Sequence, residues 1–374
     1  MNAPKTRVLA VMIGRVNPVT KAHLNILKQA ATISDDILML VGSSYRPRSF
    51  KNPLKFDERK ALIKRFTAKV QARVDILPLI DTLYSDRTWA GNVRLAVKSY
   101  IRARGWDQDG VKIVLTGFEK DKSSRYLKWF PEWEALPAKP VMHEGRVVSA
   151  TDLRTALFLP SKSVEIGRLS EAFGHAQVGA FMEWMEANPA AVEAVRDEAA
   201  FNLQYRELTQ RAEAVFGFPI PINTADPVVI QSGHVLMVRR GVQPGKGTLA
   251  LPGGHLERDE TAEQAAIREL REETRLDVPP GLLVNRIKDR KVFDHPERSE
   301  RGWVRTEAFL IELEDRNPLE KVKGSDDAEK AIWVPIDEIR PDEMFEDHFD
   351  ILQHFIPEVS LSYNSILMAH LQAI

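Results

Sequence analysis

Cysteine is absent from the 374 residues of the chain. Its absence excludes disulfide bonds, thiolate nucleophiles, CxxC redox pairs and thiolate zinc sites, so a metal would need carboxylate, imidazole or carbonyl ligands. An excess of charge is also absent, because 52 Lys and Arg stand against 53 Asp and Glu, a net charge of −1. No global field attracts a nucleic acid or an anionic membrane, and we expect neither as a partner.

Long apolar runs are missing as well. The longest run near the N-terminus covers residues 8–13, far short of the ~20 residues that cross a bilayer and short for a signal sequence. We therefore expect a cytoplasmic protein. Hydrophobic residues make up 44% of the chain, enough for a packed core, and at roughly 100–200 residues per domain the length predicts two domains.

The first third of the chain alternates apolar runs with helix-period segments. The apolar runs, typical of buried parallel strands, lie at 7–13, 37–41, 74–79 and 111–115. The amphipathic segments between them lie at 20–31, 56–67 and 86–104, and Asp86 stands where an N-cap is expected. This βαβα order predicts a doubly wound α/β sheet.

The pattern changes twice further along. Residues 163–216 favour helix, with a break near Asn188, and predict a helical cap and connector. After a Pro-rich turn at 218–221, the sequence predicts a hairpin over 228–238, a helix near 262–274, and strands at 304–312 and 330–334. We therefore predict an α/β domain at 1–185, a connector at 186–217 and an α+β domain at 218–374.

Two hydroxyl-containing motifs in the first domain are suited to anions. The first predicted strand ends at Gly14 and leads into Thr20-Lys-Ala-His23 at the start of a helix, where unpaired N–H groups and the helix dipole favour phosphate. Ser149, Thr151 and Arg154 open another helix in the same way. Taken singly, each motif could equally be a helix cap beside solvated side chains.

Together, the two motifs resemble the (H/T)xGH nucleotidyltransferase superfamily, although Ala22 replaces the usual Gly. The resemblance implies a Rossmann-like fold, with His23 and Arg154 as catalytic residues. It also implies an ATP site made of Gly14, Arg15, Thr20, His23, Ser149, Thr151 and Arg154.

Segments 86–92 and 117–133 are similar to those of archaeal-type nicotinamide mononucleotide (NMN) adenylyltransferases. The similarity implies that Trp89 stacks on the nicotinamide ring, a cationic pyridinium that suits an aromatic face. Asp86, Asn92 and Arg46 are the further candidates for NMN binding, and Arg48 is a second candidate for its phosphate. The alternative for Trp89 is a core aromatic residue on an amphipathic helix.

A cluster of glutamates marks the second domain. Thr261 and Gln264 form a potential capping box, so a helix begins there. Glu269, Glu272 and Glu273 then fall at i, i+3 and i+4 on one face of this helix. Close carboxylates repel one another unless a divalent cation neutralises them, and oxygen ligands suit Mg²⁺ or Mn²⁺. The alternative is a solvated acidic face.

The register from Gly254 to Glu273 resembles the Nudix box of diphosphate hydrolases, with Arg275 in place of a usual Gly. This implies a Nudix fold and a metal site at Gly254, Glu269, Glu272 and Glu273. Glu269 would also help to activate water, Arg268 and Glu260 would support the carboxylates, and Glu329 or Asp327 would add a later acidic group.

Both likenesses together resemble a bacterial family in which an NMN adenylyltransferase is joined to an ADP-ribose pyrophosphatase. The family implies formation of NAD and pyrophosphate from NMN and ATP, and hydrolysis of ADP-ribose to AMP and ribose 5-phosphate, with Mg²⁺ in both reactions. Three alternatives stay open: another nucleoside diphosphate substrate for the Nudix half, a Nudix half that binds ADP-ribose or NAD without cleavage, and a pantetheine or flavin phosphate as the acceptor. The sequence also leaves open whether the chain forms a homo-oligomer and whether it prefers the amide or the acid mononucleotide.

Overall fold

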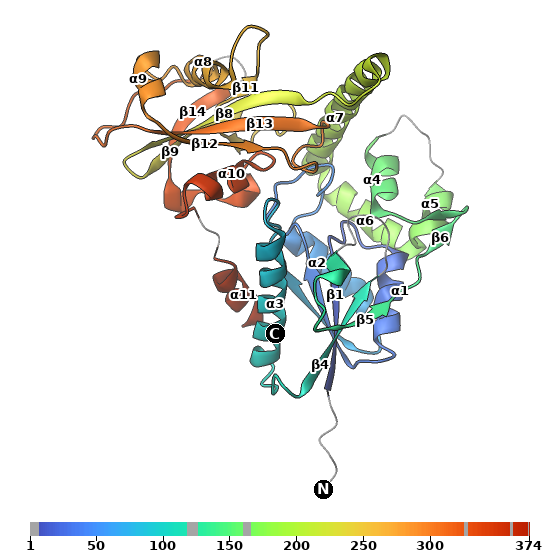
Figure 1. The fold of residues 1–374 in the computed structure, drawn as a ribbon. Helices are drawn as coiled ribbons and strands as arrows, with labels where there is room; N and C mark the ends of the chain where they lie inside the picture. The colour runs from blue at the N-terminus through green and yellow to red at the C-terminus, as the bar shows by residue number, and fades with distance from the viewer. Residues whose placement is uncertain (1–6, 118–125, 160–165, 325–327, 360–361, 373) are drawn as a thin grey trace. The chain divides into compact units, whose positions relative to one another are not determined.

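A computed structural model describes residues 7–117, 126–159, 166–324, 328–359, 362–372 and 374. Contacts divide the chain into two compact units, Met1–Arg196 with Ser362–Ile374, and Asp197–Leu361. Figure 1 shows the helices and strands of both units. In the described part of the chain, no helix has both the length and the apolar character needed to cross a membrane.

The first unit is built on a five-stranded sheet of order β3-β2-β1-β4-β5, in which every pairing is parallel. Its strands are β1 (Arg7–Gly14), β2 (Asp36–Val41), β3 (Arg73–Pro78), β4 (Val111–Gly117) and β5 (Glu134–Pro137). The helices between them are α1 (Lys21–Ala30), α2 (Phe56–Thr67) and α3 (Asp86–Ala103). The predicted doubly wound sheet is confirmed, and β5 is a strand that the sequence pattern missed.

Alternate residues of β1 enter different cores. Leu9, Val11 and Ile13 belong to the hydrophobic cluster that includes α3, whereas Ala10 and Met12 belong to the one that includes α1 and α2. A strand buried on both faces must be apolar throughout, which is why this segment reads as a continuous run. Chain order reverses between β1 and β4, so the crevice at their carboxyl ends is where such sheets bind ligands.

Helices complete the first unit. A short β6 (Met142–His143) and β7 (Arg146–Val147) precede α4 (Ala150–Phe158), α5 (Ile166–Phe173), α6 (His175–Ala187) and α7 (Pro189–Phe216). The helical stretch and its break at Asn188 are therefore as predicted. Helix α7 belongs to both units, because the contacts change at residue 197.

The last helix, α11 (Tyr363–Leu371), packs on the first unit although it follows the second in sequence. Leu367 and Leu371 lie in the same core as Tyr100 of α3, and the Tyr363 hydroxyl donates to the Pro78 carbonyl at 2.7 Å. The chain thus divides differently from the predicted 218–374 domain. The physical reason is the apolar i, i+4, i+8 face of α11, which is complementary to α3.

The second unit contains a seven-stranded mixed sheet of order β10-β9-β8-β13-β12, with β11 paired to β8 and β14 to β9. Its strands are β8 (Ile222–Gln231), β9 (His234–Arg240), β10 (Leu249–Ala250), β11 (Gly254–His255), β12 (Ile287–Phe293), β13 (Val304–Glu312) and β14 (Ala328–Pro335). Its helices are α8 (Ala262–Thr274), α9 (Pro280–Asn285) and α10 (His348–Phe355). The predicted hairpin, helix and later strands are present, and the α+β class is confirmed.

Candidate active sites

Helix α1 begins at the carboxyl end of β1, and its first turn fixes the ring of His23. Thr20 is the N-cap; its backbone N–H donates to His23 Nδ1 at 3.0 Å, and its hydroxyl lies 2.9 Å from the same nitrogen. Because Nδ1 accepts a backbone hydrogen, the neutral ring carries its own hydrogen on Nε2. His23 is therefore a donor at a helix N-terminus, while Thr20, at 1% exposure, holds the ring in place.

The two anion motifs of the first unit lie together. The guanidinium of Arg154 in α4 donates to the Asn17 carbonyl at 2.6 Å and to Thr151 Oγ1 at 3.0 Å. Ser149 caps α4 by accepting the Thr151 N–H at 3.2 Å. A contact between residues 137 apart thus joins the glycine turn to α4. Arg154 is buried and positioned by this turn.

A buried arginine that the sequence analysis missed joins the carboxyl ends of β1 and β2. Arg59 of α2 donates to the carbonyls of Arg15 and Gly42, each at 2.7 Å, and to that of Ser43 at 2.9 Å. Burial lowers its pKa to about 10, so it stays charged at neutral pH. The available signal was its position on the apolar face of α2, in line with Phe56 and Ile63.

The candidate NMN residues lie mainly on α3, with one correction to the predicted N-cap. The N-cap of α3 is Ser85, which accepts the Thr88 N–H, so the prediction that Asp86 caps the helix is wrong. Asp86 is exposed in the first turn, and Asn92 lies two turns further on, half-buried. The guanidinium of Arg48 forms a bidentate pair with Glu58 at 3.1 Å.

Trp89 lies within an aromatic cluster on the same helix. Its ring centroid is 5.5 Å from that of Tyr126, 5.7 Å from Trp129 and 6.4 Å from Phe130. The side chain is partly buried and packs against the core of the first unit. Arg46 follows β2 and is half-buried, and residues 118–125 of the second NMN-like segment lie outside the described residues.

In the second unit, α8 carries the glutamate cluster. Thr261 and Gln264 form the reciprocal capping box, with hydrogen bonds of 3.3 and 2.8 Å, and Ala265, Ala266 and Leu270 face the core. Arg275 ends the helix in the left-handed region at φ 48°, the conformation for which Gly is favoured, and its N–H still bonds to the Arg271 carbonyl. The departure at Arg275 therefore leaves α8 intact.

Arg268 organises the carboxylates around it. Its guanidinium contacts Glu260 at 2.7 Å, Glu269 at 2.9 Å and Glu272 at 3.0 Å. These partners raise the pKa of Arg268 above its usual range, and the largest cause that raises it is the hydrogen bond that Arg268 donates to Glu260. The sequence placed Arg268 and Glu260 as supports, and the structure gives both a geometry suited to that role.

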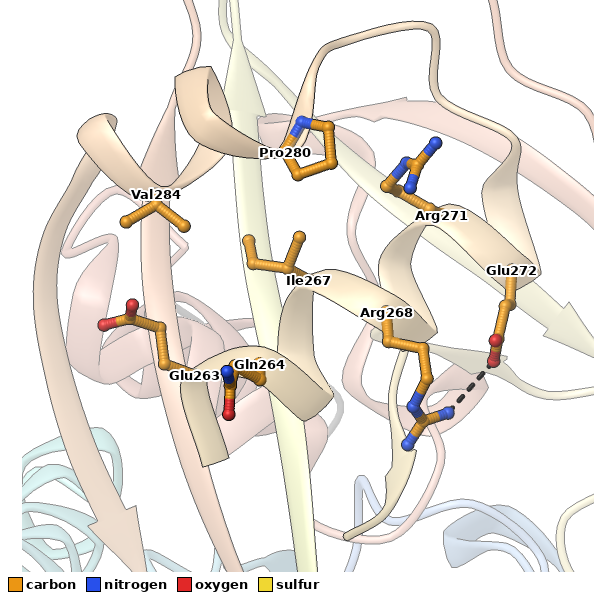
Figure 2. A pocket seen from close by; sticks show the side chains of 8 residues that line it. All are labelled: Glu263, Gln264, Ile267, Arg268, Arg271, Glu272, Pro280 and Val284. Atoms are coloured by element: carbon orange, nitrogen blue, oxygen red, sulfur yellow. Dashed lines mark hydrogen bonds and ion pairs between the residues drawn. The ribbon is translucent and has the colours of Figure 1, made fainter. Parts of the chain in front are cut away.

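Only part of the glutamate set shares one cavity. One cavity, of about 320 Å³, is lined by residues that include Gly253, Gly254, Glu269 and Glu273. Glu272 instead lines a separate hollow of about 500 Å³ on the outer side of α8, with Ile267, Pro280 and Val284 (Figure 2). Asp327 and the side chain of Glu329 lie outside the described part of the chain. Among described residues, no group of three or more acidic or imidazole side chains is close enough to hold a metal.

The cavity nonetheless fits a divalent cation at two carboxylates. A Cβ on Gly254 would lie 2.4 Å from Glu269 Oε1, so only glycine lets this carboxylate approach the backbone there. The Gly253 N–H donates to Glu273 Oε2 at 3.0 Å. Burial, opposed by this hydrogen bond and reinforced by the charge of Glu269, raises the pKa of Glu273 to about 8. Carboxylates that resist ionisation when close together are stabilised by a cation between them.

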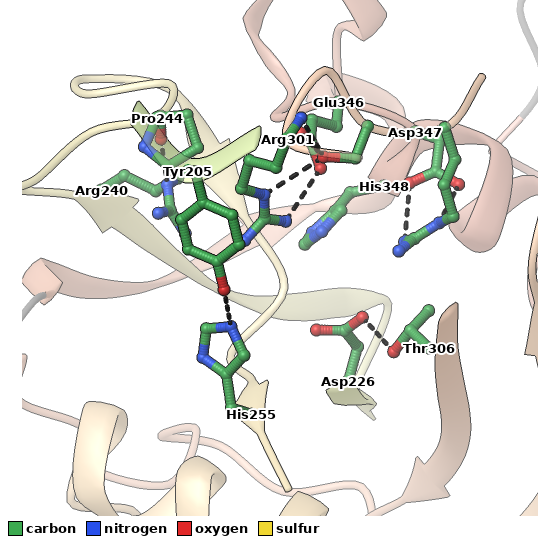
Figure 3. Close-up of polar contacts among 12 residues, drawn as sticks. Tyr205, Asp226, Arg240, Pro244, His255, Arg301, Thr306, Glu346, Asp347 and His348 are labelled. Carbon is green, nitrogen blue, oxygen red and sulfur yellow. Dashed lines mark hydrogen bonds and ion pairs between the residues drawn. The ribbon is translucent and has the colours of Figure 1, made fainter. Parts of the chain in front are cut away.

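Much of the lining of this cavity was missed from the sequence. It includes Asp226, whose pKa burial raises to about 6, and a basic wall formed by Arg240, Arg298, Arg301 and His348. Arg298 is paired with Asp347 at 2.9 Å, both almost fully buried, and Arg301 with Glu346 at 3.2 Å (Figure 3). His255 Nε2 and the Tyr205 hydroxyl of α7 share a hydrogen bond of 3.0 Å. No local sequence motif indicates these residues, since most of them come from loops and helices that are far from α8 in the sequence.

Comparisons with known proteins agree with both sites. The Cytidylyltransferase-like family model matches residues 11–124, and the NUDIX domain model matches residues 222–355. The chain is 34% identical over 153 residues to the nicotinamide/nicotinic acid mononucleotide adenylyltransferase of Acinetobacter baylyi, covering 37% of this chain and 78% of that protein. It is 30% identical over 136 residues to the ADP-ribose pyrophosphatase of Methanocaldococcus jannaschii, covering 36% of this chain and 73% of that protein.

One solved structure matches nearly the whole chain. The bifunctional NMN adenylyltransferase/ADP ribose pyrophosphatase of Francisella tularensis is 29% identical with a TM-score of 0.80, covering 95% of this chain and all of that one. The same Francisella enzyme has also been solved with AMP and a manganese ion, at a TM-score of 0.77. Both predicted halves are thus present together in one relative, and the chain belongs to the bifunctional NMN adenylyltransferase/ADP-ribose pyrophosphatase family of NAD metabolism.

Proposed function

We propose that the first unit joins NMN and ATP into NAD and pyrophosphate, and that the second hydrolyses ADP-ribose to AMP and ribose 5-phosphate. The observation that carries this proposal is the presence of two separate, differently charged sites in one chain: basic groups and helix N-termini in the first unit, and carboxylates facing a cavity in the second. Each site has the electrostatics that its reaction needs.

In the transferase, the NMN phosphate attacks the α-phosphorus of ATP and pyrophosphate leaves. This reaction needs positioning and charge stabilisation more than covalent chemistry. His23 Nε2–H, the N-terminus of α1 and Arg15 supply donors near the glycine turn, and Arg154, with Ser149 and Thr151, supplies charge at the start of α4. Gly14 keeps the backbone open where phosphate approaches. Trp89, Asp86, Asn92 and Arg46 would hold NMN.

In the hydrolase, water attacks a phosphorus of the ADP-ribose diphosphate. Glu269, Glu273 and the Gly254 carbonyl would hold a divalent cation, Mg²⁺ or Mn²⁺, and Glu272 is a further candidate ligand. Such a cation would neutralise charge that develops on the diphosphate. Arg268 and Glu260 hold the carboxylates in place, and Glu269, whose pKa is raised by burial, is suited to accept a proton from water.

Incubation of the purified protein with Mg²⁺ tests both reactions directly. With NMN and ATP we expect NAD and pyrophosphate, and with ADP-ribose we expect AMP and ribose 5-phosphate, identified by chromatography. Flavin mononucleotide and pantetheine phosphate serve as competing acceptors. Recovery of intact ADP-ribose that nonetheless binds would favour a sensor over a hydrolase, and a preference for another acceptor would contradict NMN as the substrate.

Cation affinity should depend on pH because a cation binds only the ionised form of Glu273. With a pKa of about 8, this carboxyl is mostly protonated at pH 6 and ionised at pH 9. We therefore expect Mg²⁺ binding to strengthen by up to about tenfold per unit between pH 6 and 8 and to level off above. Calorimetric titration of the nucleotide-free protein measures this dependence. Affinity that stays constant over that range would contradict the assignment of Glu273, and the Glu273→Gln variant should lose the slope.

A further inference from the structure

The basic wall of the hydrolase cavity is organised around one aromatic ring. The Phe345 centroid lies 4.2 Å from the guanidinium carbon of Arg240 and 5.2 Å from the ring centroid of His348. The ring fits there because Gly245, at φ 71°, has no side chain: a Cβ would lie 2.4 Å from Phe345 Cδ2. Phe345 therefore contacts a cation and an imidazole on the same wall, and Figure 3 shows both together with Asp226, which lines the same cavity.

The hydrogen position on His348 follows from a backbone contact. The Leu251 N–H donates to His348 Nδ1 at 2.9 Å, so the neutral ring carries its hydrogen on Nε2. The side chain is 5% exposed and lines the cavity, and Nε2 has no hydrogen-bond partner among the described residues. The one open polar atom of His348 is thus a donor that can be reached from the cavity.

This donor stays neutral. Burial is the main cause that lowers the pKa of His348 to about 3, helped by the charges of Arg298, Arg240 and Arg301 and opposed only by Asp347. With Nδ1 engaged and Nε2 already carrying hydrogen, the ring cannot take a proton from the attacking water. His348 can therefore bind an anion but cannot act as the general base.

Arg240, like His348, is positioned by a hydrogen bond to the backbone. Its Nε donates to the Pro244 carbonyl at 2.7 Å, which fixes the plane of the guanidinium over Phe345. Its two terminal nitrogens make no hydrogen bond to the described residues. By contrast, Arg298 and Arg301 on the same wall are already paired with Asp347 and Glu346.

We infer that Arg240 and His348 form a donor face that binds the diphosphate of the hydrolase substrate in the cavity that Glu269 and Glu273 also line. The inference rests on the proposed function, because it assigns the contacts of a nucleoside diphosphate in that cavity. A cation held by the glutamates would contact only some of the phosphate oxygens, and the remaining oxygens would need donors. A cationic and a neutral donor meet that need, and no proton is transferred.

The His348→Asn variant tests the inference. Asparagine can still accept the Leu251 N–H through its amide oxygen but places no donor at the position of Nε2. We expect kcat/KM for ADP-ribose to fall about tenfold or more, since a hydrogen bond to a charged group is lost. The same factor is expected at pH 6 and pH 9, because the ring is neutral at both. His354→Asn, an exposed histidine on the same helix α10, should leave the activity unchanged.

A second measurement separates this inference from the proposed function. Calorimetry with ADP-ribose and Ca²⁺ reports binding whether or not cleavage occurs, and His348→Asn should weaken binding about tenfold. If wild type binds ADP-ribose without cleaving it and the variant binds less tightly, the hydrolase proposal fails and the donor face stands. Wild-type binding and kcat/KM in His348→Asn would overturn the donor face. If that variant unfolds, Arg240→Gln takes its place with the same expected loss and the same overturning result.

Discussion

Replacing Glu272 and Glu273 together by glutamine should lower the rate of ADP-ribose hydrolysis by about 10³-fold or more and leave NAD synthesis within about twofold of wild type. Glutamine keeps the size of the side chain but removes the charge that a divalent cation requires. Most of the loss should come from Glu273, which lines the cavity, since Glu272 lines the hollow on the outer side of α8 and is paired with Arg268. The measurement is kcat for both reactions on one preparation of each variant.

Glu263→Gln is the matched control. Glu263 lies on the same helix and lines only the outer hollow, so its replacement should leave both reactions intact. A parallel fall of NAD synthesis and hydrolysis in the double variant would show that the two sites do not act separately. Equal losses in the Glu272 and Glu273 single variants would contradict the cavity assignment.

His23→Ala should lower the rate of NAD synthesis by about 10²-fold or more while ADP-ribose hydrolysis is unchanged. The variant removes a donor that Thr20 holds at the N-terminus of α1, where charge develops on the transferred phosphate. Loss of one such donor typically costs this factor in kcat. His23→Gln, which places an amide N–H near the position of Nε2, should recover part of the rate.

His175→Ala serves as the control for this prediction, because His175 is exposed at the start of α6 in the same unit. Thermal unfolding of each variant separates a local loss from a failure to fold. A His23→Ala enzyme with wild-type kcat for NAD synthesis would remove His23 from the site.

Elements with a strong local pattern were predictable from sequence. The β1 run is buried on both faces, and α8 has a capping box, an apolar face and an acidic face. The order of the residues therefore indicates a buried strand in the first case and a helix in the second. The short strand β5 is exposed along most of its length and has no such pattern. At α3, Ser85 and Asp86 are both good capping residues, and only the backbone conformation decides between them.

The site residues divide in the same manner. Glutamates at helical spacing can be recognised in the sequence as a potential site. The role of His348 cannot, because its partner is a backbone N–H 97 residues away. Arg48 is a second example, since an arginine after a strand suits a phosphate, and only the fold shows that this one also pairs with Glu58. The sequence shows which residues are charged. The fold determines the group with which each of them pairs.

The position of α11 has a consequence for dissecting the protein. The polypeptide leaves the first unit after residue 196 and returns at residue 362, so the second unit is an insertion within the first. A fragment that ends at residue 217 would lack Tyr363, Leu367 and Leu371, and would expose the apolar surface they cover on α3 and β3. Burial of such side chains contributes about 1.5–3 kcal/mol each. A transferase module that folds by itself therefore needs residues 362–374 joined to its C-terminus.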